Sequence, residues 1–296
     1  MNNVMSESKH CPFVSVIIPT YYDWDRLKIC LLALSKQSYP ENSFEVIIVN
    51  NDPDDKSVVP DLFPNYIFIS ESKLGSYAAR NAGVMVARGD LFAFTDSDCI
   101  PHKDWLTNGI KMLEAGVSRI GGKIELNFKS KKRTCAEIYD KAYAFQQERY
   151  VENMQFAVTA NMMSYKSVFE KVGKFNESLL SCGDFEWGKR ASELGFSIKY
   201  CDNSVVSHPA RNNFYEIYLK NRRLSGGNFF LSKNKSLFKF LYNEAFAPFS
   251  VLSRLLKRGD LTLYEKCVAF FLAFFLKIAR LFEMVCLSFG RKPERK

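Results

Sequence analysis

Two aspartates one residue apart, Asp96 and Asp98, directly follow the apolar run LFAFT. Side chains at alternate positions of a strand point to the same face, so both acids are expected on one side if the chain stays extended. Carboxylates held together repel each other and favour a bound cation, and hard oxygen ligands suit Mg²⁺ or Mn²⁺ carrying a diphosphate. The alternative is a surface turn, because D-x-D triplets also arise by chance. The position after a buried strand favours the metal site.

A second acidic cluster lies in GDFEW, which contains Asp184 and Glu186. An acid in the first turn of a helix complements the helix dipole, and Ser181 or Asp184 is suited to cap such a helix. A carboxylate fixed at a helix start, on the rim opposite a diphosphate, is also placed to accept a proton from an attacking hydroxyl. Capping and proton transfer are compatible, so this cluster stays a candidate for both.

One histidine and one arginine pair are further candidates. His208 follows the short apolar run in VVSHPAR, where a lone histidine is more often a structural hydrogen-bonding residue than a metal ligand. Arg222 and Arg223 stand shortly before two glycines. A basic pair near a helix end usually meets water, but its forked donors can hold phosphate oxygens if the chain folds back over a ligand crevice.

The elements that must position these residues alternate between strand and helix patterns. VSVIIPT and FEVIIVN are apolar runs typical of buried strands, and DRLKICLLALSK between them has leucines at helical spacing. An Ala-rich helix that ends at Gly89 precedes LFAFT. The alternation predicts an α/β fold with a parallel sheet covered on both faces. Ligands of such sheets bind at the carboxyl ends of the strands, where we expect Thr20, Asn50, Asn51, Asp96 and Asp98.

The pattern changes after Gly122. KIELNF is typical of a strand, and AEIYDKAYAFQQERY is typical of a helical segment. SCGDFEWGKRASELGFSIKYC predicts a capped helix followed by a strand. A separate C-terminal region is expected to begin near Asn212.

Composition restricts the class of protein. The chain has 296 residues, 47% of them hydrophobic, and a net charge of +9, which suits an acidic substrate, a nucleic acid or an anionic membrane surface. The basic residues form no stripe interleaved with aromatic residues, so we expect no nucleic-acid partner. The eight cysteines include no C-x-x-C pair, and no apolar stretch near Met1 resembles a signal peptide. We therefore expect reduced thiols in a cytoplasmic protein.

The aromatic tail YEKCVAFFLAFFLKIARLFEMVCLSFG predicts an amphipathic helix. Its unbroken apolar run is only about ten residues, short of the roughly 20 that span a bilayer. Lys277 and Arg280 lie opposite its apolar face. We expect this helix to lie peripherally in the interface of an anionic membrane; the alternative is packing on the catalytic domain or on another subunit. The apolar face consists of Phe271, Phe274, Phe275, Ile278, Leu281, Phe282 and Val285.

Five segments together resemble family 2 glycosyltransferases of the GT-A fold, over roughly Phe13 to Arg211. They are VSVIIPTYYDWDRLKICLLALSKQSYP, FEVIIVNNDPDD, GSYAARNAGVMVARGDLFAFTDSDCIPHKDWL, TANMMSYKSVFEKVGKFNESLLSCGDFEWGKRASELGF and SHPAR. The resemblance implies a Rossmann-like nucleotide-binding sheet flanked by helices. We expect a catalytic domain at 12–211, with a nucleotide-binding half at about 12–122 and an acceptor half at about 123–211, and a helical region at 212–296.

The resemblance also implies roles for individual residues. Asp96 and Asp98 match the D-x-D acids that engage the nucleotide ribose and the divalent metal, and His208 matches a histidine that helps to hold that metal or the phosphates. Asp184 matches the general base, with Glu186 as its less favoured substitute. Thr20 and Tyr21 match positions that line the nucleotide base, and Arg80 lies in a segment that approaches the same pocket.

This chain departs from the family at several positions. Asn50 or Asn51 stands where an aspartate is usual, and an amide would read a base edge with both a donor and an acceptor. Gly183 stands where an acid often precedes the base. The Q-x-x-R-W signature of processive synthases is absent, so we expect one sugar added per encounter.

The function expected from the resemblance is a metal-dependent, inverting transfer in surface polysaccharide synthesis. The sugar moves from a nucleotide-sugar donor to a hydroxyl of a glycan or lipid-linked acceptor, on the cytoplasmic face of the membrane. One alternative is a catalytically silent scaffold at a membrane assembly. A sugar nucleotidyltransferase is less favoured, because the first strand lacks the Gly-rich, basic loop that grips a triphosphate.

Overall fold

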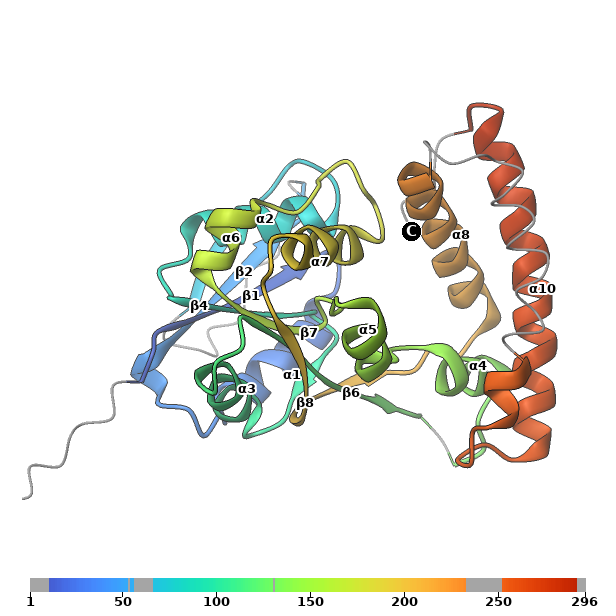
Figure 1. The fold of residues 1–296 in the computed structure, drawn as a ribbon, viewed down its shortest axis with the longest axis horizontal. Helices are drawn as coiled ribbons and strands as arrows, with labels where there is room; N and C mark the ends of the chain where they lie inside the picture. The colour runs from blue at the N-terminus through green and yellow to red at the C-terminus, as the bar shows by residue number, and fades with distance from the viewer. Residues whose placement is uncertain (1–10, 53, 56–65, 130, 233–251, 292–296) are drawn as a thin grey trace, which may run out of the picture.

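The computed structural model describes residues 11–52, 54–55, 66–129, 131–232 and 252–291. Their centre is an eight-stranded sheet in the order β3-β2-β1-β4-β7-β6-β8-β5, with helices on both faces (Figure 1). The strands are β1 Val14–Thr20, β2 Phe44–Asn50, β3 Tyr66–Ser70, β4 Leu91–Thr95, β5 Ile100–Pro101, β6 Arg119–Asn127, β7 Asn161–Tyr165 and β8 Ile198–Pro209.

The first half of the sheet is parallel, as the sequence predicts. β1 pairs in parallel with β2 and β4, and β2 pairs in parallel with β3. Every residue of β1 and β2 is buried, because side chains alternate between two covered faces. Val16 and Ile18 of β1 pack under α1 and α3, whereas Ile17 packs under α2, α6 and α7. These helices are α1 Trp24–Leu34, α2 Ser76–Val86, α3 Trp105–Glu114, α6 Lys166–Val172 and α7 Gly183–Glu193.

The second half of the sheet is mixed, which the strand patterns do not predict. β7 runs antiparallel to both β4 and β6, while β6 and β8 are parallel. The predicted Ala-rich helix ends at Val86, three residues before Gly89, because Ala87 is already extended. The segment AEIYDKAYAFQQERY, expected to be helical, lies mainly in two short helices, α4 Cys135–Tyr143 and α5 Gln147–Met154.

The C-terminal part forms two long helices, α8 Phe214–Ser232 and α10 Leu263–Ser288, which pack against each other and against α4 (Figure 1). Thr262 and Glu265 form a capping box that starts α10. The Asn221 amide donates to the Leu276 carbonyl at 2.7 Å, and Arg222 forms an ion pair with Glu283 at 2.9 Å. Buried polar contacts thus join the two C-terminal helices to each other, and Lys141 of α4 forms an ion pair with Glu265 of α10 at 3.2 Å.

The two faces of α10 differ. One face buries Ala269, Leu276 and Leu287, and the first two pack against α4, as in the alternative to membrane binding given above. The other face exposes large apolar side chains. Among the residues that the structure describes, no helix combines the length and the hydropathy needed to cross a membrane. The exposed side chains are Phe271, Phe274, Phe275, Ile278, Phe282 and Val285.

Candidate active site

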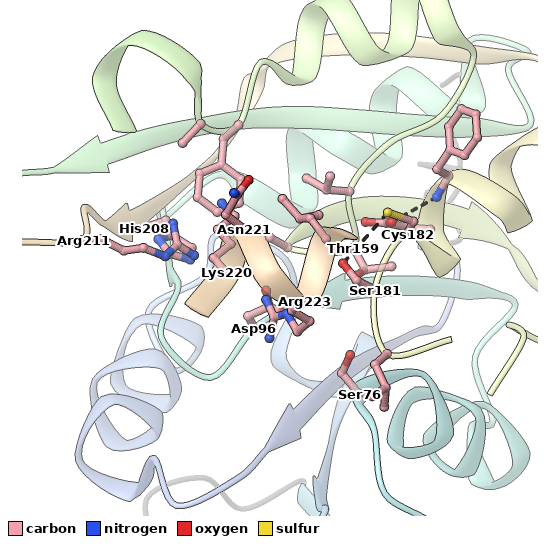
Figure 2. A pocket seen from close by; sticks show the side chains of 18 of the residues that line it. Ser76, Asp96, Thr159, Ser181, Cys182, His208, Arg211, Lys220, Asn221 and Arg223 are labelled. Carbon is pink, nitrogen blue, oxygen red and sulfur yellow. Dashed lines mark hydrogen bonds between the residues drawn. The ribbon is translucent and has the colours of Figure 1, made fainter. Parts of the chain in front are cut away.

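One cleft of about 960 Å³ collects most of the candidate residues. The carboxyl ends of β1 and β4, the starts of α2 and α7, and the end of β8 form one side of it, and α8 and α10 close the other. Figure 2 shows Asp96, His208 and Arg223 among the side chains that line it. Parallel strands present their carboxyl ends at one edge of the sheet, which is why residues distant in sequence meet here. The lining includes Thr20, Tyr21, Asn51, Arg80, Asp96, Asp98, Asp184, His208 and Arg223.

The two acids of the D-x-D triplet face different partners. β4 ends at Thr95, and the chain then turns, with the Cys99 amide donating to the Asp96 carbonyl at 3.0 Å. The expectation that both acids continue an extended strand is therefore wrong. The turn lets Asp96 form an ion pair with Arg80, while Asp98 Oδ2 lies 3.4 Å from His208 Nε2.

When the imidazole is neutral, neither of the two facing atoms of Asp98 and His208 carries a proton that could form a hydrogen bond between them. His208 Nδ1 lies 2.8 Å from the Pro209 carbonyl oxygen, which can only accept, so Nδ1 carries the proton and Nε2 presents a lone pair. Burial raises the pKa of the Asp98 carboxyl, opposed by His208. An imidazole nitrogen and a carboxylate oxygen that face each other in this way fit a cation between them.

Cys99 lies beside this pair but does not fit a hard cation. Its sulfur shares a group of potential ligand atoms, all within 4.8 Å of one another, with Asp98 and His208. Burial raises the pKa of the Cys99 thiol well above its usual range, and the thiol donates to the Ala160 carbonyl. A protonated thiol is a poor ligand for Mg²⁺ or Mn²⁺, so Asp98 and His208 are the fitting donors.

Asp184 lies in the first turn of α7, on the wall that faces the cleft. Its Oδ1 accepts from the Tyr77 hydroxyl at 3.2 Å and from the Phe185 amide at 3.0 Å. Burial raises the pKa of the Asp184 carboxyl, and the nearby Arg80 charge opposes that rise. A raised pKa makes a carboxylate a stronger proton acceptor.

The start of α7 corrects one expectation and explains another. The helix is preceded by Cys182 with φ of 63°, and no side chain caps it, so neither Ser181 nor Asp184 is its cap. At Gly183 an added Cβ would lie 2.6 Å from the Tyr77 ring. The ring that bonds Asp184 thus occupies the space that an acidic side chain at 183 would need.

The ends of β1 and β2 show which asparagine reaches the cleft. Thr20 Oγ1 is buried and has no hydrogen-bond partner among the described residues, which suits a position that meets a ligand. The Asn51 amide donates to the carbonyls of Glu71 and Lys73 and accepts from the Gly75 amide. Both donors of Asn51 are therefore committed to holding the loop before α2. Asn50 bonds the backbone of its own turn and does not line the cleft.

Two other candidates have partners elsewhere and do not line the cleft. Glu186 forms an ion pair with Arg190 at 2.7 Å, one helical turn along α7. Arg222 forms the ion pair with Glu283 of α10, whereas its neighbour Arg223 lines the cleft.

The cleft also contains residues that sequence reasoning missed. Tyr77 bonds Asp184, and Lys220 of α8 projects into the cleft with its amine 4.9 Å from the centre of the Phe145 ring. Burial, together with the charges of Arg211 and Arg223, lowers the pKa of Lys220 to about 7. The only sequence signal for Lys220 is its spacing of three residues before Arg223, which places both on one helix face.

Comparison with known proteins decides the family. The model described as glycosyl transferase family 2 matches residues 15–173, more than half of the chain. The chain belongs to glycosyltransferase family 2. The resemblance inferred from the five segments is thereby confirmed, and the molecule is a glycosyltransferase.

Relatives of this family 2 glycosyltransferase cover most of its length. Glycosyltransferase AglE of Haloferax volcanii is 36% identical over 223 residues, which are 73% of this chain and 73% of the relative. A Methanococcus voltae protein named dolichyl N-acetyl-α-D-glucosaminyl phosphate 3-β-D-2,3-diacetamido-2,3-dideoxy-β-D-glucuronosyltransferase is 26% identical, covering 68% of each chain.

A solved structure confirms the GT-A fold of this family 2 glycosyltransferase. The mannosyltransferase PcManGT from Pyrobaculum calidifontis, in complex with GDP-Man and Mn²⁺, superposes with a TM-score of 0.65 at 16% identity. The match covers 94% of this chain and 88% of PcManGT. The similarity therefore extends beyond the sheet into the C-terminal helices.

Proposed function

We propose that this family 2 glycosyltransferase catalyses a metal-dependent, inverting transfer from a nucleotide-sugar donor to a hydroxyl of an acceptor. The observation that carries the proposal is that one cleft joins the Asp98–His208 pair to Asp184. A metal-and-diphosphate site and a proton acceptor are the two parts that such a transfer requires. The GDP-Man and Mn²⁺ bound to PcManGT support the same donor class.

Each residue has a distinct task in this proposal. Asp98 and His208 would hold Mg²⁺ or Mn²⁺, which supplies electrophilic stabilisation to a departing diphosphate. Arg80, held by Asp96, faces the same side of the cleft and would donate hydrogen bonds to phosphate oxygens. Asp184 removes the proton from the attacking hydroxyl, and Tyr77 orients its carboxylate. Attack from the face opposite the leaving group gives inversion at the anomeric carbon.

The acceptor is proposed to be a glycan or a lipid-linked sugar in polysaccharide synthesis. The name of the Methanococcus voltae relative gives a dolichyl-linked phosphosugar, and another relative is named amylovoran biosynthesis glycosyltransferase AmsB. The exposed phenylalanine face of α10 supports a peripheral position on an anionic membrane, since apolar rings beside basic residues suit the interface. We place the enzyme on the cytoplasmic face, where nucleotide sugars are expected.

The test is a screen of UDP- and GDP-linked sugars with Mn²⁺, Mg²⁺ or EDTA, read by thermal shift and by release of nucleoside diphosphate. One donor should raise the melting temperature and be hydrolysed slowly, and both effects should require the metal and Asp98. Stabilisation without turnover, with any acceptor extract, would support a silent scaffold instead. Release of pyrophosphate from a nucleoside triphosphate and a sugar 1-phosphate would support a nucleotidyltransferase.

A further inference from the structure

A second cavity, of about 760 Å³, lies beside the loop 144–146, which joins α4 to α5 (Figure 1). Its walls are α4, α5, the end of β6 and the segment that precedes α10. None of the residues assigned above to the metal, the diphosphate or proton transfer lines it. Phe145 lies between the two spaces, and the centre of its ring is 4.4 Å from that of the His208 ring, on the metal side. The second cavity is therefore distinct from the donor site.

The two cavities adjoin along α5. Tyr143, Arg149 and Tyr150 line both of them. Burial raises the pKa of Tyr150, and the charges of Arg149 and Asp184 act on its hydroxyl in opposite directions. Tyr150 thus lies between Arg149 and the proton acceptor. A ligand whose reacting hydroxyl meets Asp184 would reach the second cavity with a neighbouring unit.

The cations around the second cavity differ in their partners. Three of them are paired with acids, namely Lys123 with Glu125, Lys141 with Glu265, and Arg258 with Asp260. Arg149 has no carboxylate within ion-pair range among the described residues, and it donates to the Gln146 side-chain oxygen at 3.1 Å. Its neighbour Glu148 lies towards Tyr200, since burial and the charge of Glu148 raise the pKa of Tyr200 to about 12. Arg149 thus offers its charge to a ligand.

Arg254 and the Tyr143 hydroxyl lie close to Arg149. Burial lowers the pKa of Arg254, and the charge of Arg149 lowers it further. Burial raises the pKa of Tyr143 to about 12, opposed by the charge of Arg254, so this hydroxyl stays protonated and able to donate. Its oxygen is buried and has no hydrogen-bond partner in the described part of the chain. Two guanidinium groups that repel each other and an unsatisfied hydroxyl are unfavourable, and an anion between them would relieve both.

The lining of the second cavity combines these cations with aromatic rings. Tyr143, Tyr150 and Tyr200 all contribute to it. A tyrosine offers an apolar ring and a polar hydroxyl, which suits a sugar, because sugars present both C–H groups and hydroxyls. A guanidinium fork binds the paired oxygens of a carboxylate or a phosphate. The volume lies within the range of small-ligand sites. These features together fit a sugar that carries an acid group.

We infer that Arg149, Arg254 and Tyr143 form a binding site for an acidic sugar unit of the acceptor, next to the unit that receives the new sugar. This inference rests on the proposed function and names the acceptor class as an acidic glycan. Arg149 holds the two oxygens of the acid group, the Tyr143 hydroxyl donates to one of them, and Arg254 adds positive charge. The site thus selects acceptors by their charge at a position away from the reacting hydroxyl.

The test uses the methyl glycosides of glucuronate, galacturonate and mannuronate, each matched with its neutral hexoside, and glucose 6-phosphate as a further arm. Binding is measured by ligand-detected NMR, first with the protein alone and then with Mg²⁺ and UDP or GDP, whichever binds. We expect at least one acidic sugar to bind about 10-fold or more tightly than its neutral match in both conditions. Tighter binding of a uronate assigns the acid group to a carboxylate, and tighter binding of glucose 6-phosphate assigns it to a phosphate ester.

The variants Arg149→Met and Arg254→Met should each weaken binding of the acidic sugar about 10-fold or more, and Tyr143→Phe, which keeps the ring, about threefold to 10-fold. Lys189→Met is the control, because Lys189 is an exposed lysine on α7 paired with Glu193. The inference is overturned if no acidic sugar binds more tightly than its neutral match, if the nucleotide displaces the sugar, or if Arg149→Met and Tyr143→Phe bind it as the control does. Absence of metal-dependent nucleotide binding would instead refute the proposed function, and it would be seen in a titration without sugar.

Discussion

The Nε2 atom of His208 lies 3.4 Å from the Oδ2 atom of Asp98, although the two residues come from opposite halves of the sheet. His208 is the penultimate residue of β8, and Asp98 lies on the turn after β4. Because the Nδ1–H group of His208 donates a hydrogen bond to the Pro209 carbonyl, Nε2 and the Asp98 oxygen that faces it are both acceptors when the imidazole is neutral. Arg26 Nη1 lies 3.7 Å from the same Asp98 oxygen, but two acceptors in contact are stabilised further by a cation or a proton between them.

Asp98→Asn should therefore raise the stability of the metal-free protein while weakening metal-dependent binding of the nucleotide sugar. The amide can donate to His208 Nε2, so the metal-free protein should gain about 1 kcal/mol in free energy of unfolding. Metal-dependent binding of the nucleotide sugar should fall about 100-fold or be lost, because the anionic ligand is gone. Asp90→Asn, at an exposed acid before β4, is the control for calorimetry and denaturation. Unchanged metal-dependent binding by Asp98→Asn would remove Asp98 from the site.

Asp184→Asn should reduce turnover without weakening donor binding. Proton removal by a positioned base contributes about 10²- to 10⁴-fold, so turnover should fall by about that factor. Glu186→Gln is the matched control, since Glu186 pairs with Arg190 outside the cleft, and it should keep near-normal turnover. If Glu186→Gln loses as much activity as Asp184→Asn, the assignment of the base is wrong.

The same carboxyl sets the acid limb of the pH profile. Asp184 acts as a base only when ionised, and burial raises its pKa. Turnover should therefore fall as the pH drops through that raised pKa, at a higher pH than for an exposed aspartate. In Tyr77→Phe the hydroxyl that stabilises the ionised form is lost, so the acid limb should shift to still higher pH. An unshifted profile in Tyr77→Phe would show that the contact does not stabilise the ionised base.

The parallel half of the sheet, and the meeting of Thr20 and Asp98 in one cleft, follow from the sequence. β1, β2 and β4 are long apolar runs whose burial on both faces leaves little choice of structure. Strand ends then bring Thr20 and Asp98 to one edge. β7 is not predicted, because Asn161–Tyr165 is only five residues long. Its antiparallel pairing with β4 and β6 joins segments that are distant in the sequence.

The sequence does not show which side chains of a helix or loop face the cleft and which bond other parts of the protein. Neighbouring residues of a helix point about 100° apart, so the sequence does not show which of Arg222 and Arg223 faces the cleft. The packing of α8 on α10 decides between them, because Glu283 takes Arg222. In the same way, the side-chain amide of Asn51 donates its hydrogen bonds to carbonyls of the loop before α2. Both outcomes depend on contacts between segments that are distant in sequence.

Lys220→Met should stabilise the protein in the absence of ligands. Below pH 7 the unpaired ammonium is charged in both the folded and the unfolded chain, so its full burial penalty opposes folding. Above pH 7 the folded protein releases this proton first, and the penalty declines towards the pKa of an unfolded lysine. The gain in free energy of unfolding should be about 1 to 3 kcal/mol at pH 6 and smaller at pH 9.

Chemical denaturation of Lys220→Met at the two pH values checks this expectation, with Lys189→Met as the exposed control. The control should show no gain that depends on pH. Equal destabilisation of Lys220→Met at both pH values would mean that the contact of Lys220 with Phe145 outweighs the charge penalty.

The exposed face of α10 should bind anionic vesicles. Phe271 and Phe282 are 67% and 66% exposed on that face, and burial of each ring in the interface contributes about 1.5 to 3 kcal/mol. Phe271→Asp and Phe282→Asp together should thus reduce sedimentation with phosphatidylglycerol vesicles more than 10-fold. Leu194→Asp, at a residue 58% exposed after α7, should leave it unchanged. Vesicle binding that survives the double substitution would contradict the membrane role, and a dimer that dissociates upon the same substitution would assign the face to a second copy of the chain.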